Sequence, residues 1–141
     1  METPRISKWR PEAMVAYNFQ SQFVDAIESG AKSHTVRRMS KRRHAREGDR
    51  LQLYTGMRTK ACRKILDPDP VCLKVQSIVL EVGDESIVAA EIDGTPVNDL
   101  AAFASSDGFE SLETFHRFWR MFHGVGIFHG KLIAWGTECH E

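Results

Sequence analysis

The sequence has few cysteines and no long apolar segment. Its three cysteines, Cys62, Cys72 and Cys139, are an odd number without the paired spacing of a metal knuckle. We therefore expect reduced thiols and a cytoplasmic protein. No apolar run reaches the roughly 18 residues that a membrane helix needs, and the first residues lack the apolar centre of a secretory signal. These absences predict a protein that is neither disulfide-stapled, nor membrane-spanning, nor secreted.

The chain also lacks net charge, because 19 Lys and Arg residues balance 19 Asp and Glu residues. Their distribution is uneven: the segment from Lys32 to Lys64 holds 12 basic and only 2 acidic residues. The remainder is correspondingly acidic. A basic face on an acidic body favours a polyanionic partner such as nucleic acid. The alternatives are a solvated surface balanced by nearby carboxylates, and a surface that binds an acidic protein.

Hydrophobic periodicity predicts an α+β fold, and the length of 141 residues fits one domain over 14–141 after an N-terminal tail over 1–13. Alternation favours strands, and steps of three and four favour helices. Asn18 is a candidate N-cap for the first helix, which ends before Gly30. Several strands with an early and a late helix suggest a small mixed β-barrel with two or more flanking helices. The expected strands are 13–19, 34–38, 48–56, 71–82, 86–94 and 127–136, and the helical segments are 19–29 and 99–124.

The segment after Gly30 combines residue types that amide hydrolysis could use. A threonine hydroxyl such as that of Thr35 is a nucleophile once a base takes its proton, and a desolvated lysine such as Lys32 can be that base. On a straight strand these two side chains would point to opposite faces, so a bend after Gly30 is required. The alternative is a solvated turn lysine beside a strand-forming threonine.

The pattern G-x-K-x-x-T-x-R at residues 30–37 resembles the signature of ASCH domains, which are relatives of the PUA-like RNA-binding barrels. The later Asp107-Gly108-Phe109 and Glu113-Thr114-Phe115 are similar to the family's acidic-Gly-Phe and Glu-x-Phe elements. The resemblance covers roughly residues 14–136.

This resemblance implies a small PUA-like mixed β-barrel whose cleft binds RNA or modified nucleosides. Some bacterial members are amidohydrolases that deacetylate N4-acetylcytidine, and their catalytic lysine, threonine and acid correspond here to Lys32, Thr35 and Asp107. The chain differs from them in having Asp in place of Glu and a longer basic insertion after Arg37. Asp107 has a second interpretation, as a helix N-cap with Glu110 completing a capping box. Other relatives are ribonucleases or RNA binders.

Further residues are candidates for binding. Arg37 can hold a phosphate or carboxylate with its guanidinium, and Tyr54 can stack on a base; the alternatives are a surface arginine and a half-buried barrel tyrosine. The nearby basic run is too dense to bury and is expected to contact phosphates without reading sequence. The expected nucleic-acid-binding residues are Arg38, Lys41, Arg42, Arg43, Arg46, Arg58 and Lys60.

No metal or cofactor is expected. The histidines near the end of the chain lack the spacing of zinc ligands, and "GVGIFHGK" departs from a phosphate-binding loop. The sequence thus predicts an RNA- or nucleoside-directed hydrolase, with amide hydrolysis of an N4-acylated cytidine as its sharpest form. The alternative is a non-catalytic RNA-binding module, or a ribonuclease, that uses the same basic cleft. The histidines near the end of the chain, which lack the spacing of zinc ligands, are His116, His123, His129 and His140.

Overall fold

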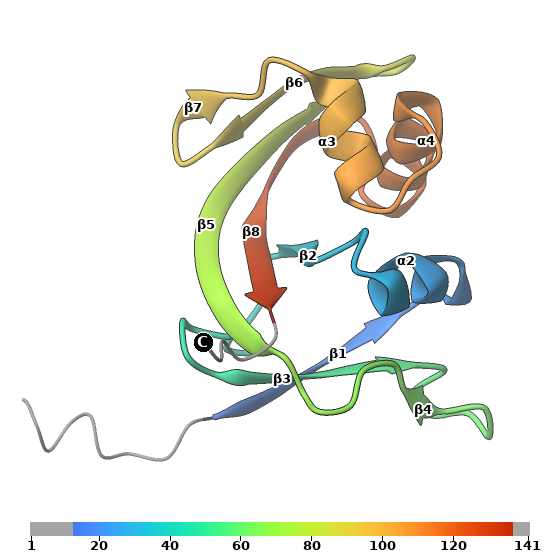
Figure 1. Ribbon diagram of the computed structural model, residues 1–141. Coiled ribbons are helices and arrows are strands. Elements are labelled where there is room, and N and C mark those ends of the chain that lie inside the picture. Colours follow the sequence, from blue (N-terminus) through green and yellow to red (C-terminus); the bar gives the residue numbers. More distant parts are fainter. Residues whose placement is uncertain (1–12, 137–141) are drawn as a thin grey trace, which may run out of the picture.

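The computed structural model describes residues 13–136 and shows a mixed α+β fold (Figure 1). One eight-stranded sheet is accompanied within these residues by three α-helices and a short 3-10 helix. The elements are β1 (Met14–Phe19), η1 (Ser21–Phe23), α2 (Val24–Ser29), β2 (His34–Arg38), β3 (Arg50–Thr55), β4 (Arg63–Lys64), β5 (Val71–Val82), β6 (Ile87–Ile92), β7 (Thr95–Pro96), α3 (Leu100–Ser106), α4 (Leu112–Phe122) and β8 (Gly126–Gly136). A strand lies in each of the six segments where alternation predicts one.

The alternating side chains of the early strands explain their burial. In β1 the residues Val15, Tyr17 and Phe19 are buried while their neighbours are not, and β3 buries Leu51 and Leu53 in the same way. This period of two places one face of each strand against the core. The other face is left to solvent or to polar contacts.

The long strand β5 organises the sheet. It pairs with β8 along its whole length, and its other edge pairs with β3 at the start and with β6 at the end. β8 continues to β2, and β3 continues to β1 in parallel. Figure 1 shows β5 and β8 running side by side as a curved pair. β2 and β1 therefore lie at opposite ends of the path β2–β8–β5–β3–β1.

The predicted barrel is not confirmed, because no described strand pairs with the second edge of β1 and the sheet is not closed. Two arginine side chains cross the gap between β1 and β2 instead. Arg37 donates from Nη2 to the Asn18 carbonyl at 2.8 Å, and Arg42 donates to the Ala16 carbonyl. We call this gap the β1–β2 seam. Its backbone acceptors are met by side chains and not by a strand.

The helices differ from the predicted ones at their ends. Asn18 does not cap the first helix: it belongs to β1, and its Oδ1 accepts a hydrogen bond from the Met57 amide at 2.9 Å. The late helical segment is broken into α3 and α4. The capping box of α4 is formed by Ser111 and Thr114, and Asp107 lies at the C-terminal end of α3. The predicted capping role of Asp107 with Glu110 is therefore wrong.

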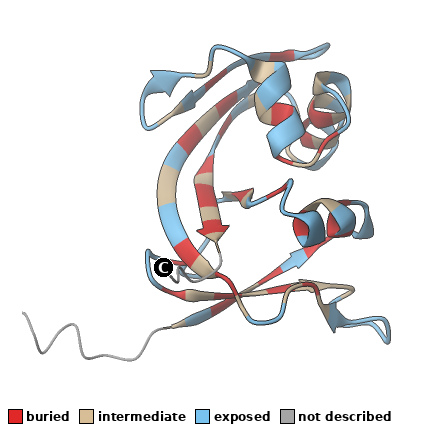
Figure 2. Ribbon diagram, in the orientation of Figure 1, coloured by how far each residue is buried: buried red, intermediate tan, exposed pale blue. Residues whose placement is uncertain are grey.

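The helices border the sheet on two sides of β2. Figure 1 places α3 and α4 together near β6, and α2 near β1, with β2 between the two groups. Buried positions occur on all three α-helices and along the strands (Figure 2). Phe115 and Trp119 of α4 are buried, and the Trp119 ring lies 4.5 Å from that of Phe128 in β8. No helix among the described residues combines the length and apolar character needed to cross a membrane.

Candidate functional site

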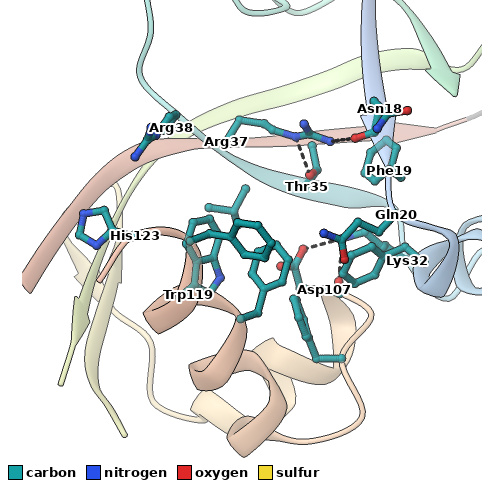
Figure 3. A pocket seen from close by; sticks show the side chains of 15 residues that line it. Asn18, Phe19, Gln20, Lys32, Thr35, Arg37, Arg38, Asp107, Trp119 and His123 are labelled. Carbon is teal, nitrogen blue, oxygen red and sulfur yellow. Dashed lines mark hydrogen bonds and ion pairs between the residues drawn. The ribbon is translucent and has the colours of Figure 1, made fainter. Parts of the chain in front are cut away.

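A cavity of about 390 Å³ opens between the end of β1, β2, the 107–109 turn and α4 (Figure 3). We call it the central cavity. Its polar lining includes Lys32, Thr35, Arg37, Arg38, Asp107 and His123, and its aromatic lining consists of Phe19, Phe23, Phe109, Phe118, Trp119 and Phe122. Figure 3 shows Thr35 and Arg37 of β2 and Asp107 at the end of α3 around the same space, with Lys32 beside Asp107. The predicted site residues Lys32, Thr35, Arg37 and Asp107 thus come together although 75 positions separate Lys32 from Asp107.

Lys32 and Asp107 form a buried ion pair. The Lys32 Nζ donates to Asp107 Oδ1 at 2.8 Å and to the Asp107 carbonyl at 2.7 Å. The two side chains are only 3% and 4% exposed. Burial lowers the pKa of the Lys32 ammonium, and the nearby Asp107 carboxylate opposes this effect without cancelling it. At a given pH, the neutral fraction of this amine is therefore larger than that of an exposed lysine.

Two glycines allow the pair to form. Gly30 ends α2 with φ of 90°, and the Lys32 amide then donates to the Ala26 carbonyl at 2.9 Å. Gly108 follows Asp107 with φ of 93°, and a Cβ at this position would lie 2.9 Å from Lys32 Cδ and 3.0 Å from the Phe23 ring. The first glycine supplies the bend that the sequence requires. The second leaves room for the lysine to reach the carboxylate.

His34 is a neighbour of this pair that the sequence motif does not predict. Its Nε2 lies 3.2 Å from Asp107 Oδ1 but lacks the geometry of a hydrogen bond. The imidazole stacks on Phe103 at 5.5 Å between ring centres. His34 lies within the G-x-K-x-x-T-x-R pattern, at one of its unspecified positions. Only the folded structure shows that this position faces the acid of the 107–109 turn.

Thr35 and Arg37 form the opposite part of the site. Arg37 Nε donates to Thr35 Oγ1 at 3.1 Å, and its guanidinium lies over the rings of Tyr17 and Phe19 at 5.1 and 4.8 Å. No carboxylate within the described residues forms an ion pair with Arg37. Burial lowers the pKa of Arg37 to about 10. A half-buried cation beside a hydroxyl oxygen can stabilise negative charge that develops there.

The basic run divides into engaged and free side chains. Arg42 lies over the Tyr17 ring and reaches the Ala16 carbonyl, and Arg43 pairs with Asp49 at 3.3 Å. Arg38, Lys41 and Arg46 are exposed, and their side chains make no hydrogen bond or ion pair within residues 13–136. Arg38 also lines the central cavity. The free side chains are therefore better candidates for phosphate contacts than Arg42 and Arg43.

Three predicted binding residues lie outside both the central cavity and the basic run. Arg58 and Lys60 occupy the exposed turn between β3 and β4, and Tyr54 lies on β3 opposite Lys64. None of them lines the central cavity. The ring faces available there belong instead to Phe19, Phe118 and Phe122, which the sequence analysis did not assign to the site. Trp119 and Phe122 belong to the aromatic stripe of α4, whose spacing indicates packing but does not show which members line a cavity.

The described histidines do not gather as metal ligands. His116 Nε2 contacts the Gly83 carbonyl at 2.7 Å, and His123 lines the central cavity. No three His, Cys, Asp or Glu side chains come together as a metal-binding group within residues 13–136. Cys139 and His140 lie outside the described residues.

Comparisons with known proteins leave the family as a prediction from the motif. The chain matches no family model, and no match is found among curated proteins or among solved structures. The case for a function therefore depends on the geometry of the central cavity and on the resemblance of residues 30–37 and 107–115 to ASCH domains.

Proposed function

We propose that the protein is an ASCH-type hydrolase that acts on RNA or nucleosides, and that it cleaves an amide such as the N4-acetyl group of a modified cytidine. The observation that carries this proposal is the buried Lys32–Asp107 pair in one cavity with Thr35, whose Oγ1 accepts a hydrogen bond from Arg37. A buried amine of lowered pKa, a hydroxyl and a carboxylate are the groups that the resemblance assigns to catalysis.

The PUA-like barrel belongs to the same proposal. Supporting it is the order β2–β8–β5–β3–β1, in which Arg37 of β2 and Arg42 of the following loop contact β1 across the β1–β2 seam. In this view the barrel is open at the seam, and the central cavity lies beside the opening. The seam residue Arg37 would then serve the fold and the site together.

The proposed reaction begins with neutral Lys32 taking the proton of the Thr35 hydroxyl as Oγ1 attacks the acyl carbon. Arg37 stabilises the negative charge that develops near Oγ1. The carbon–nitrogen bond then breaks, and the proton passes from Lys32 to the leaving amine. In a second step water attacks the acyl-threonine and gives a proton to Lys32. The bond between the acyl carbon and Oγ1 then breaks, Lys32 returns the proton to Oγ1, and the carboxylic acid is released. Asp107 holds the Lys32 amine in place through both steps.

A second candidate is a non-catalytic RNA-binding module, or a ribonuclease, that uses the same cavity. The observation that favours it is the group of free cations, Arg38, Lys41 and Arg46, at and beside the cavity mouth. This function needs a basic and aromatic groove but does not need the buried pair. Substitution of Lys32 therefore separates the two candidates.

The test is to incubate the pure protein with acylated nucleosides and with RNA oligomers and to follow the products by mass spectrometry. Lys32→Ala and Lys32→Arg are both expected to abolish deacylation, because arginine does not give up its proton at ordinary pH. Since the base must be neutral, kcat/KM of the wild type should rise with pH up to the lowered pKa of Lys32 and then level off. Full activity in Lys32→Arg would contradict the assignment of Lys32 as the base.

A further inference from the structure

Several hollows lie around the central cavity, and two of them carry aromatic or basic residues. The first, of about 510 Å³, lies along α4 and shares Gln20, Phe109, Phe118 and Phe122 with the central cavity. The second, of about 440 Å³, is lined mainly by the loop between β2 and β3. We call them the α4 hollow and the basic groove. A free nucleoside that filled the central cavity would leave both of them unoccupied.

Phe122 forms the wall between the central cavity and the α4 hollow. It is 56% exposed, and its ring lies 4.7 Å from that of Phe118 at an angle of 45°. Exposed Arg117 lines the same hollow, and its side chain makes no hydrogen bond or ion pair within the described residues; the nearby carboxylate is Glu110. An exposed ring held in contact with a second ring is a platform on which a base of any identity can stack.

The basic groove differs from the α4 hollow in its high density of positive charge. Five Lys and Arg side chains and one Glu line it: Lys41, Arg42, Arg43, Arg46, Lys131 and Glu47. The guanidinium carbons of Arg42, in this groove, and Arg37, in the central cavity, both lie over the Tyr17 ring, at 5.5 and 5.1 Å. The groove and the cavity are therefore neighbours, with one aromatic ring contacted from both.

We infer that the protein binds a single-stranded RNA segment across these three sites. The reacting base occupies the central cavity, a neighbouring base stacks on Phe122, and the backbone phosphates lie along the basic groove. A base can enter a walled cavity only when it is out of a duplex stack, so a single strand is the form that fits. The combination of an aromatic platform and a cationic groove complements the alternating bases and phosphates of a strand.

This inference rests on the proposed function only in that the reacting base uses the same central cavity. Its kinetic test compares Phe122→Ala with Val88→Ala, a substitution of an equally exposed apolar residue on β6 that lines none of the three sites. The substrates are free N4-acetylcytidine and a short oligoribonucleotide that contains one such residue. The ratio of kcat/KM for the oligomer to that for the nucleoside should fall about tenfold in Phe122→Ala. It should not change in Val88→Ala.

Binding provides a readout that does not depend on turnover. A fluorescent oligoribonucleotide without the acetyl group should bind the wild type, and its dissociation constant should rise about tenfold in Phe122→Ala. Binding without any deacylation would remove the hydrolase proposal and support this inference. Deacylation of the free nucleoside without binding of the oligomer, or an unchanged ratio in Phe122→Ala, would overturn the inference and leave the hydrolase proposal standing.

Discussion

Lys32 and Asp107 place opposite charges in a region with little access to water. A buried pair of this kind gains from its short contact but loses the hydration of both groups, so its net contribution to stability is small. Removal of one partner is more costly, because the other charge remains buried. Lys32 also donates to the Asp107 carbonyl, so its loss would leave two acceptors without their donor.

Lys32→Met is expected to lower the free energy of unfolding by about 3–5 kcal/mol, since it leaves the Asp107 carboxylate buried without its cation. The double variant Lys32→Met with Asp107→Leu should lose less than the sum of the two single variants, because no charge then remains unpaired. Urea unfolding of the wild type, the two single variants and the double variant measures the coupling. Strict additivity would show that the two side chains do not stabilise each other.

Residue identity predicted the polar part of the site better than its aromatic part. Lys32, Thr35 and Arg37 are close in sequence, so a single motif with a glycine bend brings them near one another. Asp107 required the family resemblance, because its local pattern indicated a helix cap. Phe19, Phe23 and Phe118 follow the spacing of core residues, and nothing in that spacing distinguishes a cavity wall from a filled core.

The loop between β2 and β3 is held to the body of the protein by a small set of polar contacts. His44 Nε2 donates to the Arg38 carbonyl at 2.8 Å, which leaves Nδ1 to accept from the Tyr17 hydroxyl at 3.0 Å. The same hydroxyl accepts from the Ala45 amide at 3.1 Å. Burial raises the pKa of Tyr17, so the hydroxyl keeps its proton at neutral pH and can act as this donor. The Tyr17 phenol thus ties the loop to β1, in addition to the contact of Arg42 with the Ala16 carbonyl.

Tyr17→Phe should release this loop. The change leaves the buried Ala45 amide without an acceptor, and we expect a loss of about 1–3 kcal/mol in the free energy of unfolding. Amide hydrogen exchange over residues 39–46 should become faster than in the wild type. Tyr54→Phe is the matched control, because the Tyr54 hydroxyl makes no hydrogen bond within the described residues. Equal exchange in the two variants would mean that the phenol does not hold the loop.

Elements were predictable where their periodicity is local. All six strands expected from alternation are present, whereas β4 and β7 are two residues long and too short to leave a pattern. The late helical segment divides into α3 and α4 on either side of Gly108, and helical spacing alone does not predict where the first helix ends. The closure of the sheet depends on the distance between the edges of β1 and β2. The local sequence carries no information on this distance.

Charge asymmetry is the property of the whole molecule that most affects its choice of partner. The basic segment from Lys32 to Lys64 supplies most of the lining of the basic groove, with Arg38 at the adjoining cavity mouth. Arg42 and Arg43 are committed to contacts within the protein. The side chains free to release counterions from a phosphate backbone are therefore Arg38, Lys41 and Arg46.

Replacement of Arg38, Lys41 and Arg46 by glutamine should weaken RNA binding to a similar degree for all sequences. If each contacts one phosphate, the slope of log K against log salt should become shallower by about 2 units for a single strand. The control replaces Arg63, Lys64 and Arg120 by glutamine. It removes the same charge, but from side chains that are paired with Glu28, Asp69 and Asp84. An equal change of slope in both triple variants would assign the effect to net charge and not to the groove.

Arg42 has two possible contacts that compete with each other, one at the open edge of β1 and one in the basic groove. Its guanidinium shelters the Ala16 carbonyl at the β1–β2 seam, and it also lines the groove that would receive phosphates. An uncovered strand edge is a template on which another copy of a chain can add a strand. A polyanion that draws Arg42 away would therefore expose the edge and promote self-association, so that occupancy of the groove and oligomeric state become linked. Light scattering at increasing concentrations of a short polyanion should show the apparent mass rise with occupancy, and a constant mass would show that the edge stays covered.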